Sequence, residues 1–178
     1  MKFFKIALIV SAFFLFGCND KTNSEQVNKE ADLTNVFVFS VEFVAKKTDN
    51  FALFYTEDGT VNFGKKVLWK QANGSEATQN IDFLLPKDVN PTQFRLDLGT
   101  SQEQSEVILK SITFKFNDKK RVIKGLEMGA FFRADDTKCS FDYKTGIVKT
   151  ITKDGKNQGF SLYPHEVVQA SELPKLLK

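Results

Sequence analysis

Large apolar residues alternate with small or polar ones along much of this chain, and this period of two most constrains its fold. The first such run places four large side chains at every second position: Phe37, Phe39, Val41 and Phe43. Because successive side chains of a strand point to opposite faces of a sheet, these four share one face. The run predicts a strand with one face in a hydrophobic core.

Further strand-like runs recur about every 12 to 18 residues, separated by turn residues. They lie at residues 51–56, 67–69, 81–85, 94–98, 107–116, 140–143, 147–151 and 159–163. In the longest run, one face is expected to carry Ile108, Ile112, Phe114 and Phe116. This rhythm is typical of an antiparallel β-sandwich rather than of βαβ units.

One segment departs from the alternation. Apolar residues at helical spacing (Ile123, Leu126, Ala130 and Phe131) predict one short helix near residues 123–133. With 178 residues, 42% of them hydrophobic, the chain has enough apolar surface for one core. We therefore expect a mostly β domain at residues 33–165, followed by a weakly amphipathic and potentially helical tail at residues 166–178.

The N-terminus has the pattern of a lipoprotein signal peptide. Lys2 and Lys5 precede an apolar run at residues 6–16, which is too short to span a membrane. The run ends in Leu15-Phe16-Gly17-Cys18, which resembles the lipobox, although Phe16 is larger than is usual there. We expect residues 1–17 to be removed and Cys18 to be acylated, with palmitate among its lipid chains. The alternative is an uncleaved N-terminal anchor.

The polar segment at residues 18–32 is expected to be a flexible tether between the lipid and the domain, because it lacks apolar residues to bury. We therefore expect the protein to be exported and anchored by its lipid to the cell envelope. Asn19 replaces the aspartate that retains lipoproteins at the inner membrane of enteric bacteria, which favours the outer membrane. The net charge of +3 with scattered signs gives no argument for nucleic acid.

A resemblance to a known module rests on the order of several segments. They are Phe54–Gly59, Ile81–Pro86, Phe94–Gly99, Ile108–Phe114, and Ile123-Lys124-Gly125 leading into Phe131-Phe132. Together they resemble a small Bacteroidetes-type β-sandwich module that occurs alone and beside membrane glycosyltransferases of surface-polysaccharide pathways. Such modules are similar in architecture to jelly-roll carbohydrate-binding modules. The resemblance implies a jelly-roll-like sandwich that binds sugar.

Five residues are the candidate ligand-binding positions. Arg95 and Asp97 share one strand face and could present a donor fork and an acceptor to sugar hydroxyls, or form an ion pair of purely structural value. Aromatic rings stack on sugars, which makes Trp69, Tyr55 and Tyr143 candidates. Trp69 is the strongest because a polar loop follows it, although a lone Trp in a sandwich is more often a core residue.

The remaining chemistry-bearing residues are expected to have ordinary roles. Cys139 is best interpreted as a small buried hydrophobic residue, His165 as a surface histidine, and Asp135-Asp136 as a solvated turn rather than a catalytic carboxylate pair. No enzyme and no cofactor is predicted, and a structural calcium has no ligand set that can be named.

The sequence therefore predicts a non-catalytic, membrane-tethered β-sandwich that binds carbohydrate or envelope polysaccharide. The alternative is a protein-interaction or assembly lipoprotein, an accessory of an envelope complex. The expected partners are the membrane, through the lipid anchor, and a glycan or an envelope protein, with no nucleic acid.

Overall fold

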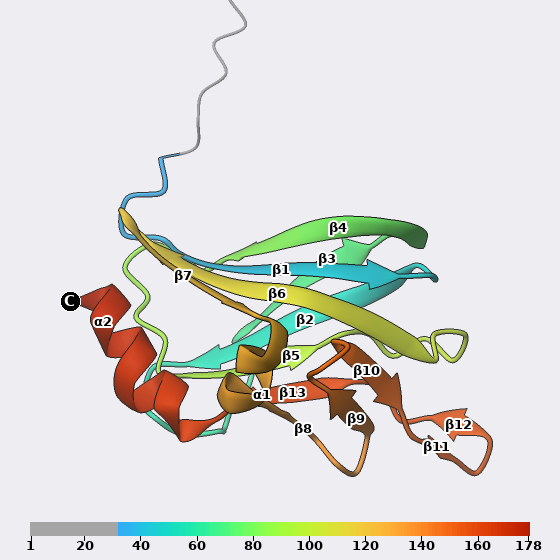
Figure 1. The fold of residues 1–178 in the computed structure, drawn as a ribbon. Helices are drawn as coiled ribbons and strands as arrows, with labels where there is room; N and C mark the ends of the chain where they lie inside the picture. Colours follow the sequence, from blue (N-terminus) through green and yellow to red (C-terminus); the bar gives the residue numbers. More distant parts are fainter. Residues whose placement is uncertain (1–31) are drawn as a thin grey trace, which may run out of the picture. The chain divides into compact units, whose positions relative to one another are not determined.

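A computed structural model describes residues 32–178 of this protein (Figure 1). The expected signal peptide, Cys18 and all of the tether except its last residue lie outside the described residues. Within residues 32–178, no helix has the length and hydropathy needed to cross a membrane.

Two antiparallel sheets form two layers, as Figure 1 shows. Sheet A has the order β4-β1-β6-β10-β9, with β7 also pairing with β6. Its strands are β1 (Phe37–Ala45), β4 (Ser75–Leu84), β6 (Glu106–Phe116), β7 (Lys119–Lys124), β9 (Cys139–Asp142) and β10 (Ile147–Thr150). Sheet B has the order β3-β2-β5-β13-β8. Its strands are β2 (Asp49–Thr56), β3 (Val67–Ala72), β5 (Gln93–Asp97), β8 (Phe132–Ala134) and β13 (Ser161–Pro164). A small hairpin of β11 (Thr152–Lys153) and β12 (Lys156–Asn157) stands apart. The predicted mostly β, antiparallel sandwich is confirmed.

Phenylalanine rings fill the space between the two sheets. Phe39 of β1 lies 5.2 Å from Phe94 of β5, and Phe43 of β1 lies 4.7 Å from Phe51 of β2, between ring centroids. The four large residues expected on one face of β1 are all fully buried. Burying aromatic rings of this size is a major source of stability, and their tilted contacts add to it.

A β-bulge in β6 changes which side chains face the core. Adjacent residues of β1 pair with Ser111 and with Leu109, so Lys110 is an extra residue without a partner. Such an insertion reverses the alternation beyond it. Val107 and Leu109 are therefore buried, and the expected inward position of Ile108 is wrong, since this residue is only partly buried.

The short helix is present but begins later than expected. Ile123 belongs to β7, a 3-10 turn follows at Gly125–Glu127, and α1 covers only Met128–Phe131. Tertiary pairing explains the difference, because β7 pairs with β6 over its whole length and holds Ile123 opposite Ile112.

The C-terminal tail closes one end of the sandwich. A π-helical turn (Val168–Glu172) leads into α2 (Leu173–Leu177), which contacts β6 and β7. Val168, Leu173 and Leu176 are buried as part of the hydrophobic core. In Figure 1 this tail lies at the end of the sandwich where the described chain begins.

Candidate functional site

The alternation predicted for β5 is confirmed and determines where its charged side chains lie. Phe94 and Leu96 are buried between the sheets, whereas Arg95 and Asp97 are partly exposed on the opposite side. Their neighbours across β2 in the ladder are Phe54 and Ala52. Arg95 and Asp97 therefore belong to the outer face of sheet B, in the middle of the sheet.

Arg95 and Asp97 form a bidentate ion pair along one strand. Arg95 Nε donates to Asp97 Oδ1 and Arg95 Nη2 donates to Asp97 Oδ2, each at 3.0 Å. The side chains are 23% and 17% exposed. The geometry is the planar fork that guanidinium and carboxylate groups prefer. Two of the five guanidinium N–H donors are used, which leaves others able to reach a ligand.

An aromatic pair extends this ion pair toward the edge of sheet B. The Arg95 guanidinium carbon lies 3.8 Å from the centroid of the Phe54 ring, and Phe54 meets Trp69 edge to face at 6.2 Å. Trp69 lies on β3, the edge strand, and is 58% exposed. Trp69 is therefore a surface residue, and the alternative that it lies in the core is wrong. We call Trp69, Phe54, Arg95 and Asp97 the Trp69 platform.

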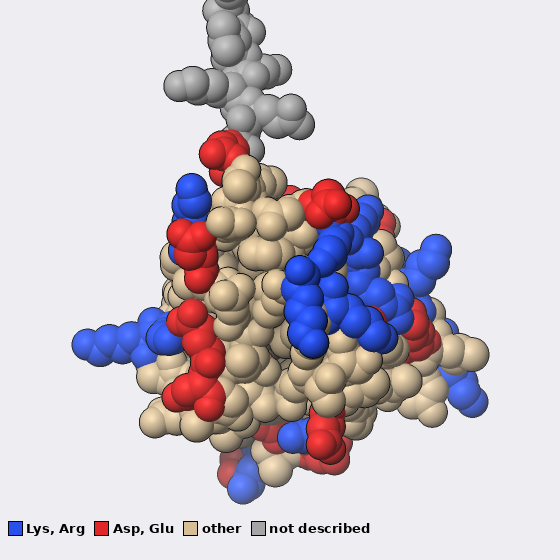
Figure 2. Space-filling view, turned by 90° about the vertical axis from the view of Figure 1, so that its left-hand side faces the viewer, with Lys and Arg blue, Asp and Glu red and all other residues tan. Residues whose placement is uncertain are grey.

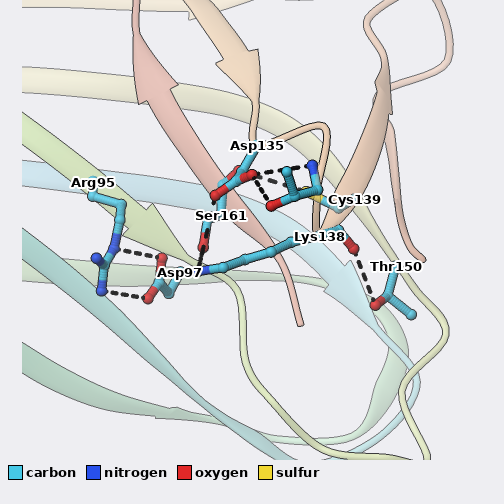
Figure 3. Close-up of polar contacts among 8 residues, drawn as sticks. Arg95, Asp97, Asp135, Lys138, Cys139, Thr150 and Ser161 are labelled. Carbon is cyan, nitrogen blue, oxygen red and sulfur yellow. Dashed lines mark hydrogen bonds and ion pairs between the residues drawn. The ribbon is translucent and has the colours of Figure 1, made fainter. Parts of the chain in front are cut away.

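A second polar cluster adjoins the platform on the side of β13. Ser161 is paired with Asp97 in the ladder, and Lys138 Nζ donates to Ser161 Oγ at 3.2 Å. Asp135 Oδ2 lies 4.0 Å from the same ammonium. Figure 3 shows the Arg95–Asp97 pair beside this cluster. The Arg95–Asp97 pair thus adjoins a second polar cluster, in which Ser161 itself is buried and bonded to Lys138.

Asp135 has a structural explanation as a turn residue. Its Oδ1 accepts hydrogen bonds from the Thr137 hydroxyl at 2.6 Å and the Thr137 N–H at 3.1 Å. The Thr137 hydroxyl is the largest contribution lowering the pKa of this carboxyl. Among residues 32–178, no three His, Cys, Asp or Glu side chains are grouped to hold a metal ion.

Two of the five candidate residues lie away from the platform. Tyr55 is 7% exposed and faces the core, because it follows the outward Phe54 in the same strand. Burial removes it from the candidate site. Tyr143 is exposed, but it lies in the connection between β9 and β10 and its ring packs against Gly129. The structure brings together Trp69, Arg95 and Asp97 only.

Phe54 is a platform residue that the sequence did not single out. It lies in Phe51-Ala52-Leu53-Phe54-Tyr55, where apolar residues fill every position, so alternation cannot assign a face. Phe54 is assigned to the outer face because Arg95, its partner in the ladder between β2 and β5, lies on that face. Tyr163 and Arg133 form a similar stack on this face, with 5.1 Å from the guanidinium carbon to the ring centroid.

Cys139 lies beneath this surface rather than on it. It is buried, and its Sγ lies 3.5 Å from the Ser161 carbonyl oxygen. Burial raises the pKa of the thiol, which disfavours the reactive thiolate. The thiol therefore packs as a small apolar group, as the sequence favoured.

Comparison of this chain with protein-family models, curated proteins and solved structures finds no match.

Proposed function

We propose that this protein is a non-catalytic lipoprotein of the cell envelope that binds carbohydrate on the Trp69 platform. The observation that carries the proposal is the exposed ring of Trp69, held edge to face by Phe54 beside the Arg95–Asp97 pair. An exposed ring can stack on the apolar face of a sugar, while neighbouring donors and acceptors orient its hydroxyls.

Rigidity supports binding at this surface. Trp69 and Arg95 lie on paired strands rather than on loops, and Arg95 is held by both its ion pair and its stack on Phe54. Groups that are already ordered lose little conformational entropy when a ligand binds. The platform is therefore suited to a ligand that approaches the open face of the sheet.

The proposed lipid anchor on Cys18 gives this surface a location. Acyl chains stably bound to a bilayer would keep the domain at the membrane surface, where envelope polysaccharides are concentrated. We infer the outer membrane from Asn19, which follows the acylated cysteine.

The test is a glycan-array screen of the detergent-solubilised protein, followed by thermal-shift titration of each hit. We expect Trp69→Ala to weaken binding at least about tenfold, while the melting temperature without ligand stays within about 2 °C, because an exposed ring contributes little to the core. Leu126→Ala, which truncates an equally exposed apolar residue on another element, is the matched control and should change neither quantity.

Protein docking is the second candidate function, because exposed Trp and Arg are also typical of interface hot spots. Under that alternative, Trp69→Ala releases a co-purifying protein and leaves glycan binding unchanged. Loss of glycan binding together with a large fall in melting temperature would instead show that Trp69 is a folding residue, and would contradict the proposal.

A further inference from the structure

A polar groove of ≈ 460 Å³ lies on the other side of the sandwich, on the outer face of sheet A. It crosses β4, β1, β6 and β7, and hydroxyl groups line much of it: Ser40, Thr78, Ser111 and Thr113. Ser40 is paired in the ladders with Asp82 on one side and Thr113 on the other. This groove shares no residue with the Trp69 platform.

Ser40 is the unusual member of the groove. The residue is only 5% exposed, yet its Oγ has no hydrogen-bond partner among the described residues. Burial alone would raise the pKa of the neighbouring Asp82 carboxyl, but the nearby Ser40 hydroxyl, Asn80 and the charges of Lys115 and Lys70 together lower it. The Ser40 hydroxyl and this carboxyl nevertheless make no hydrogen bond of normal geometry. A buried hydroxyl without a partner is unfavourable, so this group is suited to a hydrogen bond supplied from the groove.

Lysines give one end of the groove a positive charge. Lys115 of β6 and Lys120 of β7 lie directly opposite each other and both line the groove. Like charges in this position repel, and neither lysine forms an ion pair with a carboxylate within residues 32–178. Figure 2 views the end of the molecule where β7 begins and shows Lys and Arg side chains gathered into a continuous patch. An anionic group between the two lysines would relieve their repulsion.

The other end of the groove carries an acceptor rather than a cation. Ser111 Oγ donates to Glu42 Oε2 at 2.9 Å, and this pair is four residues along β6 from Lys115, about 13 Å in an extended strand. The Glu42 carboxylate at this end disfavours a ligand with a negative charge on every unit, such as a nucleic acid, and no aromatic side chain lines the groove for base stacking. A ligand with many hydroxyls and sparse negative charge fits both ends.

We propose that this groove binds an acidic oligosaccharide, with its carboxylate or sulfate group between Lys115 and Lys120 and a sugar hydroxyl bonded to Ser40. This site is separate from the Trp69 platform and does not depend on the function proposed for it.

Isothermal titration of the detergent-solubilised protein tests the proposal with three maltooligosaccharides of equal length: one that carries a single carboxylate, one that carries a single sulfate and one that is neutral. We expect binding of at least one acidic probe, which also identifies the anionic group, and weaker binding of the neutral one. Lys120→Gln should raise the Kd of the acidic probe about tenfold, while Lys153→Gln, which removes an exposed lysine of the β11–β12 hairpin, should not.

Ser40→Ala separates a ligand-binding role from a structural one. If the hydroxyl is reserved for a ligand, its removal raises the Kd about three- to tenfold and leaves the melting temperature unchanged or higher. If Ser40 instead stabilises Asp82, the melting temperature falls and the Kd stays the same, which overturns the proposal. The proposal also fails if no acidic probe binds below about 1 mM or if Lys153→Gln weakens binding as much as Lys120→Gln. Trp69→Ala should leave this binding intact, so failure at one site is distinguishable from failure at the other.

Discussion

At Gly99, two residues after the end of β5, the backbone adopts a left-handed conformation with φ 104° beside the buried carboxylate of Asp49. Asp49 accepts hydrogen bonds from the N–H groups of Thr100 at 3.2 Å and Ser101 at 2.9 Å. A Cβ at Gly99 would overlap that carboxylate. Backbone conformation and close approach therefore both require glycine here.

We expect Gly99→Ala to reduce the free energy of unfolding by about 2–4 kcal/mol, because it adds a steric clash to the cost of the left-handed backbone. Gly59→Ala is the matched control. Gly59 also has positive φ, but no atom lies within 4 Å of an added Cβ, so the expected loss is about 1 kcal/mol. Urea unfolding measures both, and equal losses would show that the clash with Asp49 is relieved at little cost.

At the scale of elements, Arg121 of β7 connects the C-terminal tail to the sandwich. Its Nε donates to Glu172 Oε2 at 2.7 Å, its Nη2 pairs with Glu127, and its guanidinium carbon lies 5.0 Å from the centroid of the Phe131 ring. Burial alone would raise the pKa of Glu172, but hydrogen bonds from Arg121 and Lys175 outweigh it and lower the pKa. Ionised Glu172 therefore stabilises the docked tail.

Glu172→Gln should lower the free energy of unfolding at pH 7 by about 1–2 kcal/mol, because Arg121 loses a charged partner. A lowered folded-state pKa means that this stabilisation is present above the unfolded pKa of about 4.3 and is lost as pH falls through the folded-state value. Thermal unfolding from pH 7 to pH 2 should show the wild-type and variant curves converging in acid. Glu166→Gln, an exposed position of the same tail, should match wild type throughout. A difference for Glu172→Gln that is independent of pH would exclude the charge interaction as its cause.

For the molecule as a whole, the two candidate surfaces are the outer faces of opposite sheets, joined by one phenylalanine core. Binding at one face needs no movement of the other, so we expect ligands at the two faces to act independently. Under the two proposals, each site would bind its own polysaccharide chain without cooperativity between the sites.

We expect Cys18→Ser to move the protein from the membrane fraction to the soluble fraction, because the residue proposed to carry the acyl chains is lost. The melting temperature of the domain should not change, since its core lies within residues 32–178. Fractionation with metabolic labelling by a palmitate analogue is the measurement, and Ser24→Ala in the expected tether is the control. Unchanged labelling of Cys18→Ser would contradict the lipid anchor.

The sequence alone determined those features that depend on local alternation. It predicted most strands of the sandwich, the inward face of β1, and the shared outward face of Arg95 and Asp97, because a strand places every second side chain on the same side. It also located the short helix and indicated that Asp135 belongs to a turn. These features need only the period of two or the chemistry of neighbouring residues.

Tertiary structure decided the features that depend on which strands pair and in what register. The bulge at Lys110 reversed the alternation in β6, and only the ladder with β1 reveals it. Trp69 is exposed because it lies on the outer face of the edge strand β3, while Tyr55 is buried because it lies on the core-facing side of β2. Ser40 meets Thr113, and Lys115 meets Lys120, across strands that the sequence does not place side by side. Local spacing determines which face of a strand each side chain lies on. The register between paired strands determines which side chains become its neighbours, and both candidate surfaces are made of such neighbours.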